Sequence, residues 1–417
     1  MTTQKLYFES IPSLLIILIP FFLITGPFLS DLALSIVALI FLINTCLNDL
    51  KKFYNNIYFK LFILFWFVLI TSSLLSDNIL TSLKNSFFYF RFGIFALCFW
   101  YLIEKNEKIL NYLFFSILFC FIILIIDGYI QYIFGQNLFG WELSNIFRVS
   151  SFFGSELILG SYLSRFFPIL FGLFIYMDKK NRSKKILFLV TVIFILSEGL
   201  IFLSGERLAL FFMNLSAIFI ILMIKNYRKY RFWTYMISLC LIIILLNIFP
   251  NSKERLLSQT LNDFTRNSDK IYIFSKPHND MYIAGYRMFL EHKFSGVGVR
   301  QFRNECKNYP VSEYSCSSHP HNTYIELLSE TGIFGFIIIF GLFVLIIYFS
   351  IKQFIYRLFR SKIEYFNDFE VCIISALIIS LWPFSPSGSF FNNWMSVVYF
   401  FPIGILLWQV NLKTIDE

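Results

Sequence analysis

The sequence predicts an all-α integral membrane protein with about twelve transmembrane helices, and three observations lead to this fold class. Of the 417 residues, 57% are hydrophobic and only 15% are charged, whereas soluble domains carry roughly a quarter charged residues. The mean hydropathy is +0.68, and the 56 phenylalanines suit lipid-facing helices better than a water-soluble core. Apolar stretches of ~20 residues, the length that crosses a bilayer, recur along the chain. We therefore treat residues 1–417 as a single polytopic membrane domain.

The expected spans follow one another with short connections over most of the chain. They are 11–29, 31–47, 58–75, 84–103, 109–127, 159–177, 185–203, 207–224, 232–249, 332–350, 369–385 and 391–409. We read the first of them as a transmembrane helix and not as a cleavable signal peptide, because no small-residue cleavage site follows it.

Basic residues gather in every second connection between these spans. The basic connections read "NDLKKFYNNIYFK", "EKNEK", "DKKNRSKK", "KNYRKYR" and "IKQFIYRLFRSK". Lysine and arginine mark cytoplasmic loops, so we expect both termini in the cytoplasm. The connection 128–158 and the large loop 250–331, between the ninth and tenth helices, then face outward, away from the cytoplasm. This topology accounts for the net charge of +9 without a nucleic-acid partner.

All four histidines of the protein fall in the large loop 250–331. They are His278, His292, His319 and His321. The gathering suggests a site, although polar residues of every kind also belong in loops. Cys306 and Cys316 lie in the same loop, where an oxidising compartment permits a disulfide; two free thiols are the alternative.

The segment "HPHNTYIE" predicts a helix that begins at about residue 323. Thr323 and Glu326 have the spacing of a capping box. His321 would then lie just before a helix N-terminus, which favours anions and lowers the proton affinity of a nearby imidazole. A neutral imidazole can act as a general base. His319 and His321 form only a weak metal motif, since no carboxylate or thiolate completes a ligand set, and we expect no metal.

Two further polar segments face the same side of the membrane. In "SGER", Glu206 and Arg207 lie between two spans, and ionisable residues at this depth are functional candidates. Arg207 can point toward an anion, or it can extend to the lipid headgroups. In the loop 128–158, Glu156 lies near the mouth of the next span, and Arg148 is either a ligand or an ordinary solvated residue.

The segment 276–303 predicts an amphipathic helix that lies on the membrane. Met281, Ala284, Met288 and Phe289 fit one helical stripe. The "GVG" that follows is better explained as a turn than as a phosphate loop. Three arginines give this segment a positive character; they are Arg287, Arg300 and Arg303.

A histidine base and several arginines suit transfer from a lipid-diphosphate donor. Arginine matches diphosphate oxygens in a bidentate way, and the histidine takes a proton from the attacking hydroxyl. A polysaccharide or lipid-linked-sugar transporter is an alternative, and it predicts charged residues that line a route through the spans. A structural membrane protein with a partner-binding loop is a third possibility, but it gives Arg207 no function.

Five stretches, in order, resemble the bacterial O-antigen ligase family, which also includes O-antigen and capsule polymerases. They are "FRVSSFFGSELILGSYL", "SGERLAL", "FSGVGVRQF", "HPHNTYIELLSETGIFG" and "SPSGSFFNNW", and the similarity covers roughly residues 127–395. It implies a fold like the C-type glycosyltransferases and a metal-independent, inverting glycosyl transfer at the periplasmic face of the inner membrane. No cofactor is implied. The donor would be an undecaprenyl-diphosphate-linked glycan, and the acceptor lipid A core (O-antigen ligation) or, for a polymerase, another glycan.

The resemblance also assigns roles to individual residues. His321 matches the family's essential histidine and would be catalytic, with Asn322 beside it. Arg207 matches the diphosphate-binding arginine after the "SG" turn. The family's second loop arginine is replaced by "HND" here, so His278, Arg287 or Arg300 would supply the second diphosphate contact. Supporting roles fall to four further residues, which are Glu206, Arg148, Glu156 and His319.

Overall fold

The computed structural model describes residues 6–143, 148–181, 184–249, 253–254, 275–359 and 364–416. Within these residues the regular structure is helical, and an isolated β-bridge joins Gln136 and Glu142. The all-α class is therefore confirmed. The expected loop 250–331 is described from residue 275 onward, and of its earlier part only 253–254 belong to the described residues.

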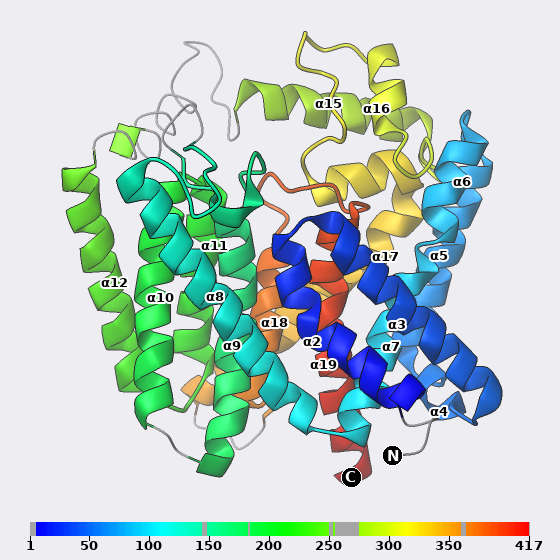
Figure 1. Ribbon diagram of the computed structural model, residues 1–417. Coiled ribbons are helices and arrows are strands. Elements are labelled where there is room, and N and C mark those ends of the chain that lie inside the picture. Colours follow the sequence, from blue (N-terminus) through cyan, green and yellow to red (C-terminus); the bar gives the residue numbers. More distant parts are fainter. Residues whose placement is uncertain are drawn as a thin grey trace.

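The helices form a bundle whose long members run in the same general direction (Figure 1). The first half holds η1 (Leu6–Ser10), α2 (Ile11–Ile24), α3 (Pro27–Leu47), α4 (Lys51–Tyr54), α5 (Ile57–Leu74), α6 (Ile79–Phe87), α7 (Phe90–Lys105) and α8 (Lys108–Phe134). The second half holds η2 (Ser151–Phe153), α9 (Leu159–Asn181), α10 (Lys184–Ser204), α11 (Arg207–Met223), α12 (Arg228–Ile248), α15 (Lys276–Glu291), α16 (Phe302–Glu305), η4 (Cys306–Asn308), α17 (Thr323–Leu358), α18 (Asp368–Ser380) and α19 (Asn393–Asp416).

Nine helical segments among the described residues are long and apolar enough to cross a membrane. Two shorter apolar helices, Tyr7–Phe22 and Arg207–Met223, accompany them. Helix α18 is also short, with 13 residues. The protein is thus an integral membrane protein, whereas the count of twelve spans stays a prediction, because three of the expected spans are shorter than a complete crossing helix.

Aromatic rings fill the contacts between the central helices. Phe92 of α7 stacks on Phe400 of α19 with ring centroids 5.6 Å apart, and Phe99 lies 5.2 Å from Phe401. A Cβ atom at Gly404 would lie 2.7 Å from that of Phe99, so the absence of a side chain lets α19 approach α7 closely. Such packing holds helices together in lipid, where the hydrophobic effect gives no preference for helix–helix contact.

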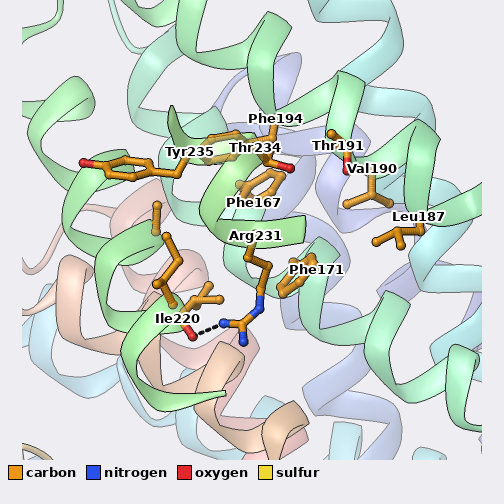
Figure 2. A pocket seen from close by; sticks show the side chains of 12 residues that line it. Phe167, Phe171, Leu187, Val190, Thr191, Phe194, Ile220, Arg231, Thr234 and Tyr235 are labelled. Carbon is orange, nitrogen blue, oxygen red and sulfur yellow. Dashed lines mark hydrogen bonds between the residues drawn. The ribbon is translucent and has the colours of Figure 1, made fainter. Parts of the chain in front are cut away.

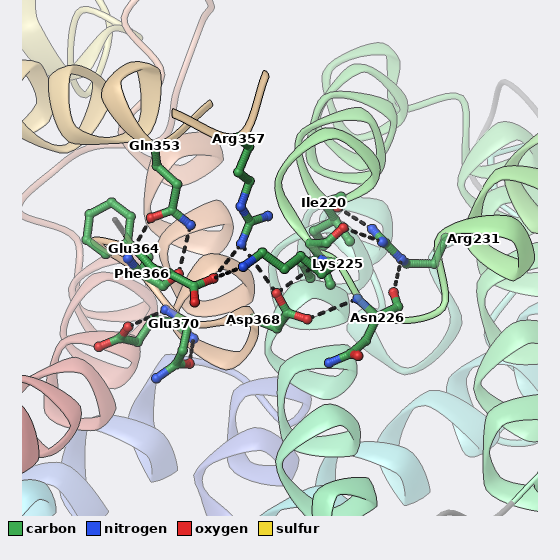
Figure 3. Close-up of polar contacts among 12 residues, drawn as sticks. Ile220, Lys225, Asn226, Arg231, Gln353, Arg357, Glu364, Phe366, Asp368 and Glu370 are labelled. Atoms are coloured by element: carbon green, nitrogen blue, oxygen red, sulfur yellow. Dashed lines mark hydrogen bonds and ion pairs between the residues drawn. The ribbon is translucent and has the colours of Figure 1, made fainter. Parts of the chain in front are cut away.

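One end of the bundle is covered by α15 and α16, whereas α4 and the C-terminal part of α19 lie at the other end (Figure 1). We call these the site end and the opposite end. At the opposite end, Asp368 accepts hydrogen bonds from the backbone N–H groups of Lys225 and Asn226, at 3.2 and 3.1 Å (Figure 3). Arg231 donates to the carbonyls of Asn226 and Ile224. These bonds satisfy the end of α11 and join it to α12 and α18.

Helix α15 contacts protein where the sequence predicted contact with lipid. Met281, Ala284 and Met288 are buried, and the two methionines pack against the cluster of Val297, Phe302 and Cys306. The expectation that this stripe lies on the membrane is therefore wrong. The segment 297–306 folds back beneath the helix and supplies an apolar partner that helical periodicity alone does not reveal.

Candidate active site

Helix α17 begins at Thr323 as predicted, but its cap differs from the expected one. The N-cap is Asn322, whose side-chain oxygen accepts from the N–H groups of Tyr324 and Ile325 at 3.0 and 3.1 Å. Thr323 instead contacts the hydroxyl of Ser387. The predicted capping box is wrong, because the connection between α18 and α19 engages the threonine and also the carboxylate of Glu326.

The same connection fixes the backbone at His321. The amide of Asn322 donates to the carbonyls of Pro383 and Ser385, at 3.0 and 3.2 Å, and the N–H of Ser387 donates to the His321 carbonyl at 2.8 Å. His321 has a φ of 54°, in the left-handed region that a non-glycine residue seldom adopts. Strain of this kind persists only where the surroundings hold it, and it clusters at functional sites.

Three of the four histidines come together at this point. The ring of His321 lies 4.0 Å from that of His319 and 5.5 Å from that of His278, between centroids. His278 comes from the first turn of α15, and Tyr282, one turn further along, donates to the His321 carbonyl at 3.3 Å. The fourth histidine, His292, follows the last residue of this helix and is exposed.

The histidine pair is held in its neutral form. Burial, with a smaller contribution from the neighbouring His319 and His278, lowers the pKa of His321 to about 3. Burial likewise lowers the pKa of His319 to about 4, with the charges of Arg303 and Arg300 adding to the effect. A neutral imidazole has a free lone pair, so His321 can accept a proton.

The "GVG" segment is a turn packed on α17. The N–H of Val297 donates to the Ser329 carbonyl at 2.9 Å, and that of Gly298 to the Glu330 carbonyl at 3.1 Å. Gly296 has a φ of 66°, and a Cβ there would meet the Glu330 backbone at 2.3 Å. Glycine is thus required for conformation and for close approach, as expected for a turn.

The carboxylate of Glu330 holds the residues that follow this turn. It accepts from the N–H of Arg300 at 2.6 Å and from that of Phe302 at 3.0 Å, and its side chain is fully buried. Arg300 is half-buried, with a φ of 59°, and its guanidinium donates to Asn85 at 3.3 Å. Burial lowers the pKa of Arg300. Glu330 therefore sets the position of Arg300 relative to α17.

The structure separates the three candidates for a second diphosphate contact. His278 contacts His321, and Arg300 lies within electrostatic reach of His319. Arg287 instead donates to the Pro310 carbonyl at 2.9 Å from an exposed position. It lies on α15 near the segment closed by the disulfide, whose half-cystines Cys306 and Cys316 have Cα atoms 5.2 Å apart.

A second polar cluster surrounds the turn between α10 and α11. The carboxylate of Glu206 accepts from the N–H groups of Gly160 and Ser161, at 2.7 and 3.0 Å, and so caps the N-terminus of α9. Burial raises the pKa of Glu206 to about 7, although these bonds and the charges of Arg148 and Arg165 oppose the rise. Arg148 donates to the Ser204 carbonyl at 2.8 Å.

The loop that carries Arg148 is held by two polar residues of α8. Gln131 accepts from the N–H groups of Ser150 and Ser151, at 2.9 and 2.7 Å, and Asp127 accepts from the Ser151 hydroxyl at 2.6 Å. Helix α8 extends to Phe134, so this connection is shorter than the expected 128–158. Glu156 is exposed beyond it, and its backbone N–H bonds to Phe153.

Sequence reasoning missed Arg165, in the second turn of α9. This arginine is 5% exposed and donates to Ser161. Its guanidinium lies over the ring of Phe212, 5.2 Å from the centroid, and interacts with the charge of Glu206. A single arginine six residues into an apolar span was the available signal, because charges at this depth are costly without a partner.

Contacts from α11 and α19 join the two clusters. Arg207 is the first residue of α11, and Phe211, one turn later on the same face, lies 6.1 Å from the ring of Trp382. Trp382 directly precedes the segment that binds Asn322. Tyr399 of α19 faces both Thr323 and Arg165. These contacts connect α11 and α9 with the segments around Thr323 and Trp382.

Among the residues that the structure describes, no group of three or more His, Cys, Asp or Glu side chains is arranged to hold a metal ion. The imidazole and guanidinium groups of this region can accept a proton and stabilise an anion.

Comparison with known proteins agrees with this chemistry. Residues 190–340 match the family model of O-antigen ligase, and this stretch contains Arg207, Arg300 and all four histidines. No protein in a curated collection matches the chain. The resemblance seen in the sequence is thereby confirmed over residues 190–340, the stretch that is similar to the O-antigen ligase family.

Proposed function

We propose that the protein transfers a glycan from an undecaprenyl-diphosphate-linked donor to an acceptor hydroxyl, without a metal or cofactor. The observation that carries the proposal is the neutral His321, held in a strained conformation beside a helix N-terminus. The O-antigen ligase match supports the donor class.

The proposed reaction needs one base and one set of cations. The acceptor oxygen attacks the anomeric carbon of the donor sugar from the face opposite the diphosphate, so the configuration inverts. Its proton passes to the His321 imidazole. The bond from the anomeric carbon to the diphosphate oxygen breaks, and the diphosphate leaves with the electron pair. The incoming negative charge of the bound donor raises the low pKa of His321, which makes the imidazole a stronger base during the reaction.

The cations act on the leaving group. Arg207 at the start of α11 is the first proposed diphosphate contact. Arg300 is the second, because Glu330 fixes its backbone and it lies within reach of the histidines. Guanidinium groups bind phosphate oxygens in pairs of parallel hydrogen bonds. His278 and His319 are proposed to shape the pocket around His321. Glu206 and Arg148 position the "SGER" turn.

We place this chemistry at the periplasmic face of the bacterial inner membrane, with both termini in the cytoplasm. The alternation of basic connections supports this orientation, and Figure 1 agrees with it insofar as α15 and the C-terminal end of α19 lie at opposite ends. The disulfide between Cys306 and Cys316 also suits an oxidising compartment.

O-antigen ligation to lipid A core is the reaction we favour, because the matching family model is that of O-antigen ligase. Polymerisation of repeat units uses the same donor and differs only in the acceptor. The two reactions are therefore separated by products and not by site residues.

The proposal is tested by complementation of a deletion strain with wild type, His321→Ala and Arg207→Ala, read on a lipopolysaccharide gel. His292→Ala and Arg228→Ala are the matched controls, because both residues are exposed; His292 lies at the end of α15 opposite to His278, and Arg228 begins α12. Membrane levels are compared by immunoblot. We expect the two site variants to lose long-chain product while undecaprenyl-linked glycan accumulates, and the controls to behave as wild type.

The form of the accumulated glycan then identifies the acceptor. Full-length unattached chains indicate a ligase, and single repeats indicate a polymerase. Full complementation by both site variants contradicts the proposal and favours the transporter interpretation.

A further inference from the structure

Glu198 is a carboxyl group in the middle of helix α10 that the proposed reaction does not use. Its side chain is fully buried, and neither carboxyl oxygen has a hydrogen-bond partner among the described residues. It lies six residues before Ser204, so it is ~9 Å deeper in the membrane than the "SGER" turn, at 1.5 Å per residue. An ionised carboxylate without a partner is very costly in such surroundings.

The groups that face Glu198 offer no compensating charge. The side chain of Tyr235, on α12, interacts electrostatically with the carboxyl group. On α8, the Tyr129 hydroxyl donates to the Leu196 carbonyl at 3.0 Å and so is directed to the α10 backbone. Ser197 and Ser238, on α10 and α12, are also fully buried, with hydroxyl groups that lack a partner among the described residues. No lysine or arginine in this part of the chain forms an ion pair with Glu198.

A largely apolar pocket lies between α9, α10, α11 and α12, and Arg231, whose guanidinium donates to the Ile220 carbonyl, also lines it (Figure 2). Its wall on α10 runs from Leu187 through Val190 and Thr191 to Phe194. Glu198 follows Phe194 by four residues, which places it on the same face of α10. Tyr235 lines the pocket and also faces Glu198. Tyr235 and the shared face of α10 therefore connect the pocket with the carboxyl group.

We propose that Glu198 is an un-ionised, proton-carrying carboxyl group that is reached from the lipid phase through this pocket. The assignment is independent of the glycosyl-transfer proposal, since it depends only on burial, on the absence of partners among the described residues and on the neighbouring pocket. It makes Glu198 a modification site for lipid-soluble carbodiimides, which react with protonated carboxyl groups in apolar surroundings.

The modification is a simple addition. The carboxyl proton moves to one nitrogen of the carbodiimide, and the carboxyl oxygen bonds to the central carbon, which gives an O-acylisourea. Migration of the acyl group from oxygen to nitrogen then gives a stable N-acylurea. All atoms of both reactants stay in the product, and no oxidant, reductant or further reactant takes part.

The test uses the full-length protein in native membranes. Separate samples are treated at pH 7.5 with dicyclohexylcarbodiimide and with a water-soluble carbodiimide, and the tryptic peptide between Lys185 and Arg207 is analysed by mass spectrometry. Fragment ions separate the adduct on Glu198 from one on Glu206, which belongs to the same peptide. Glu198→Gln is the control that removes the reactive group and keeps the shape of the side chain.

We expect the lipid-soluble reagent to label Glu198 at least about tenfold more than the water-soluble one, because water does not reach an unpaired buried carboxyl. The Thr191→Phe substitution, which narrows the pocket, should slow this labelling and leave the labelling of Glu206 unchanged. Absence of the adduct on Glu198, or equal labelling by both reagents, overturns the proposal.

Discussion

The imidazole rings of His319 and His321 lie 4.0 Å apart, centroid to centroid, on two residues separated only by Pro320. Two cations at this distance repel one another, and a like charge disfavours the protonated form of its neighbour. Burial acts in the same direction on both rings. The pair therefore keeps a neutral base available at the start of α17.

The pH dependence of transfer follows from this pair. Because burial lowers the pKa of His321 to about 3, the imidazole in the free enzyme stays neutral as the pH falls from 8 to 5.5. We expect kcat/KM for glycan transfer to change little over this range. An ordinary imidazole, with a pKa of about 6.5, would lose about tenfold by pH 5.5. A fall in kcat/KM toward acid pH with an apparent pKa near 6.5 would contradict the conclusion that burial keeps His321 neutral.

The free energy of unfolding should also depend on the neutral state of His319 and His321. A histidine whose folded-state pKa lies below its unfolded value favours the folded state in its neutral form. The contribution of His319 and His321 is therefore complete above about pH 6.5 and is lost progressively as the pH falls toward 3. Thermal unfolding of the purified protein between pH 7.5 and 5 should show this loss, and the double variant His319→Ala/His321→Ala should show less of it. If wild type and the double variant lost the same amount of thermal stability between pH 7.5 and 5, the lowered pKa values of His319 and His321 would be contradicted.

Asn322 has two roles: it caps α17, and it donates hydrogen bonds to the carbonyls of Pro383 and Ser385. Two substitutions separate these roles. Asn322→Ala removes the cap of α17, which costs about 1 kcal/mol, and also removes the bonds to Pro383 and Ser385. Asn322→Asp keeps an oxygen for the Tyr324 and Ile325 N–H groups, but its second oxygen cannot donate to the carbonyls of Pro383 and Ser385 and repels them. We expect both variants to lose transfer, and only the alanine variant to show the additional loss of thermal stability. Wild-type transfer in Asn322→Asp would mean that the two carbonyl contacts do not position His321.

Glu330→Ala should be among the most destabilising changes at the site end. It leaves the N–H groups of Arg300 and Phe302 without their acceptor, and an unsatisfied buried donor costs about 1–3 kcal/mol. Limited proteolysis should then cut near residues 296–305 at a lower protease concentration than in wild type. Glu156→Ala, at an exposed position, is the control and should leave the pattern unchanged. An unchanged pattern in both variants would show that Glu330 does not hold this segment.

The disulfide should stabilise the segment that precedes the histidines. Closing a loop of this size is worth on the order of 3 kcal/mol through restriction of the unfolded chain. Cys306→Ser, Cys316→Ser and the double variant should therefore lower the thermal midpoint by similar amounts, because each removes the same bond. Reductant should have the same effect on wild type and none on the double variant. A much larger loss in the double variant than in either single one would contradict a bond between the two cysteines.

The sequence predicts the helices well because lipid leaves few alternatives. A backbone in hydrocarbon must satisfy its hydrogen bonds internally, so a run of apolar residues in this chain implies a helix. Helix α5 begins within one residue of its predicted start, and α11 begins at Arg207 as expected. The sequence predicts the ends of helices less well than their starts. Helix α8 continues past its apolar run to Phe134, and its Gln131 accepts a hydrogen bond from the loop that follows.

The site could be predicted only where its residues are near one another in the sequence. His319, His321 and the start of α17 form a local motif. The contact of His278 with His321 depends on how α15 folds over the bundle, and the cap of α17 depends on a segment some 60 residues later. Arg165 was overlooked because its partner Glu206 lies on another helix. Pairings of this kind arise from tertiary structure and leave no local pattern.

The central claim is that His321 serves a glycosyl transfer, and transfer by the purified protein tests it most directly. Wild type and His321→Ala are reconstituted with an undecaprenyl-diphosphate-linked glycan and a lipid A core acceptor, with His292→Ala as control. We predict one undecaprenyl diphosphate released for each glycan transferred, and a rate about 10²- to 10⁴-fold lower in His321→Ala, with His292→Ala equal to wild type. Transfer by His321→Ala at the wild-type rate would contradict the account.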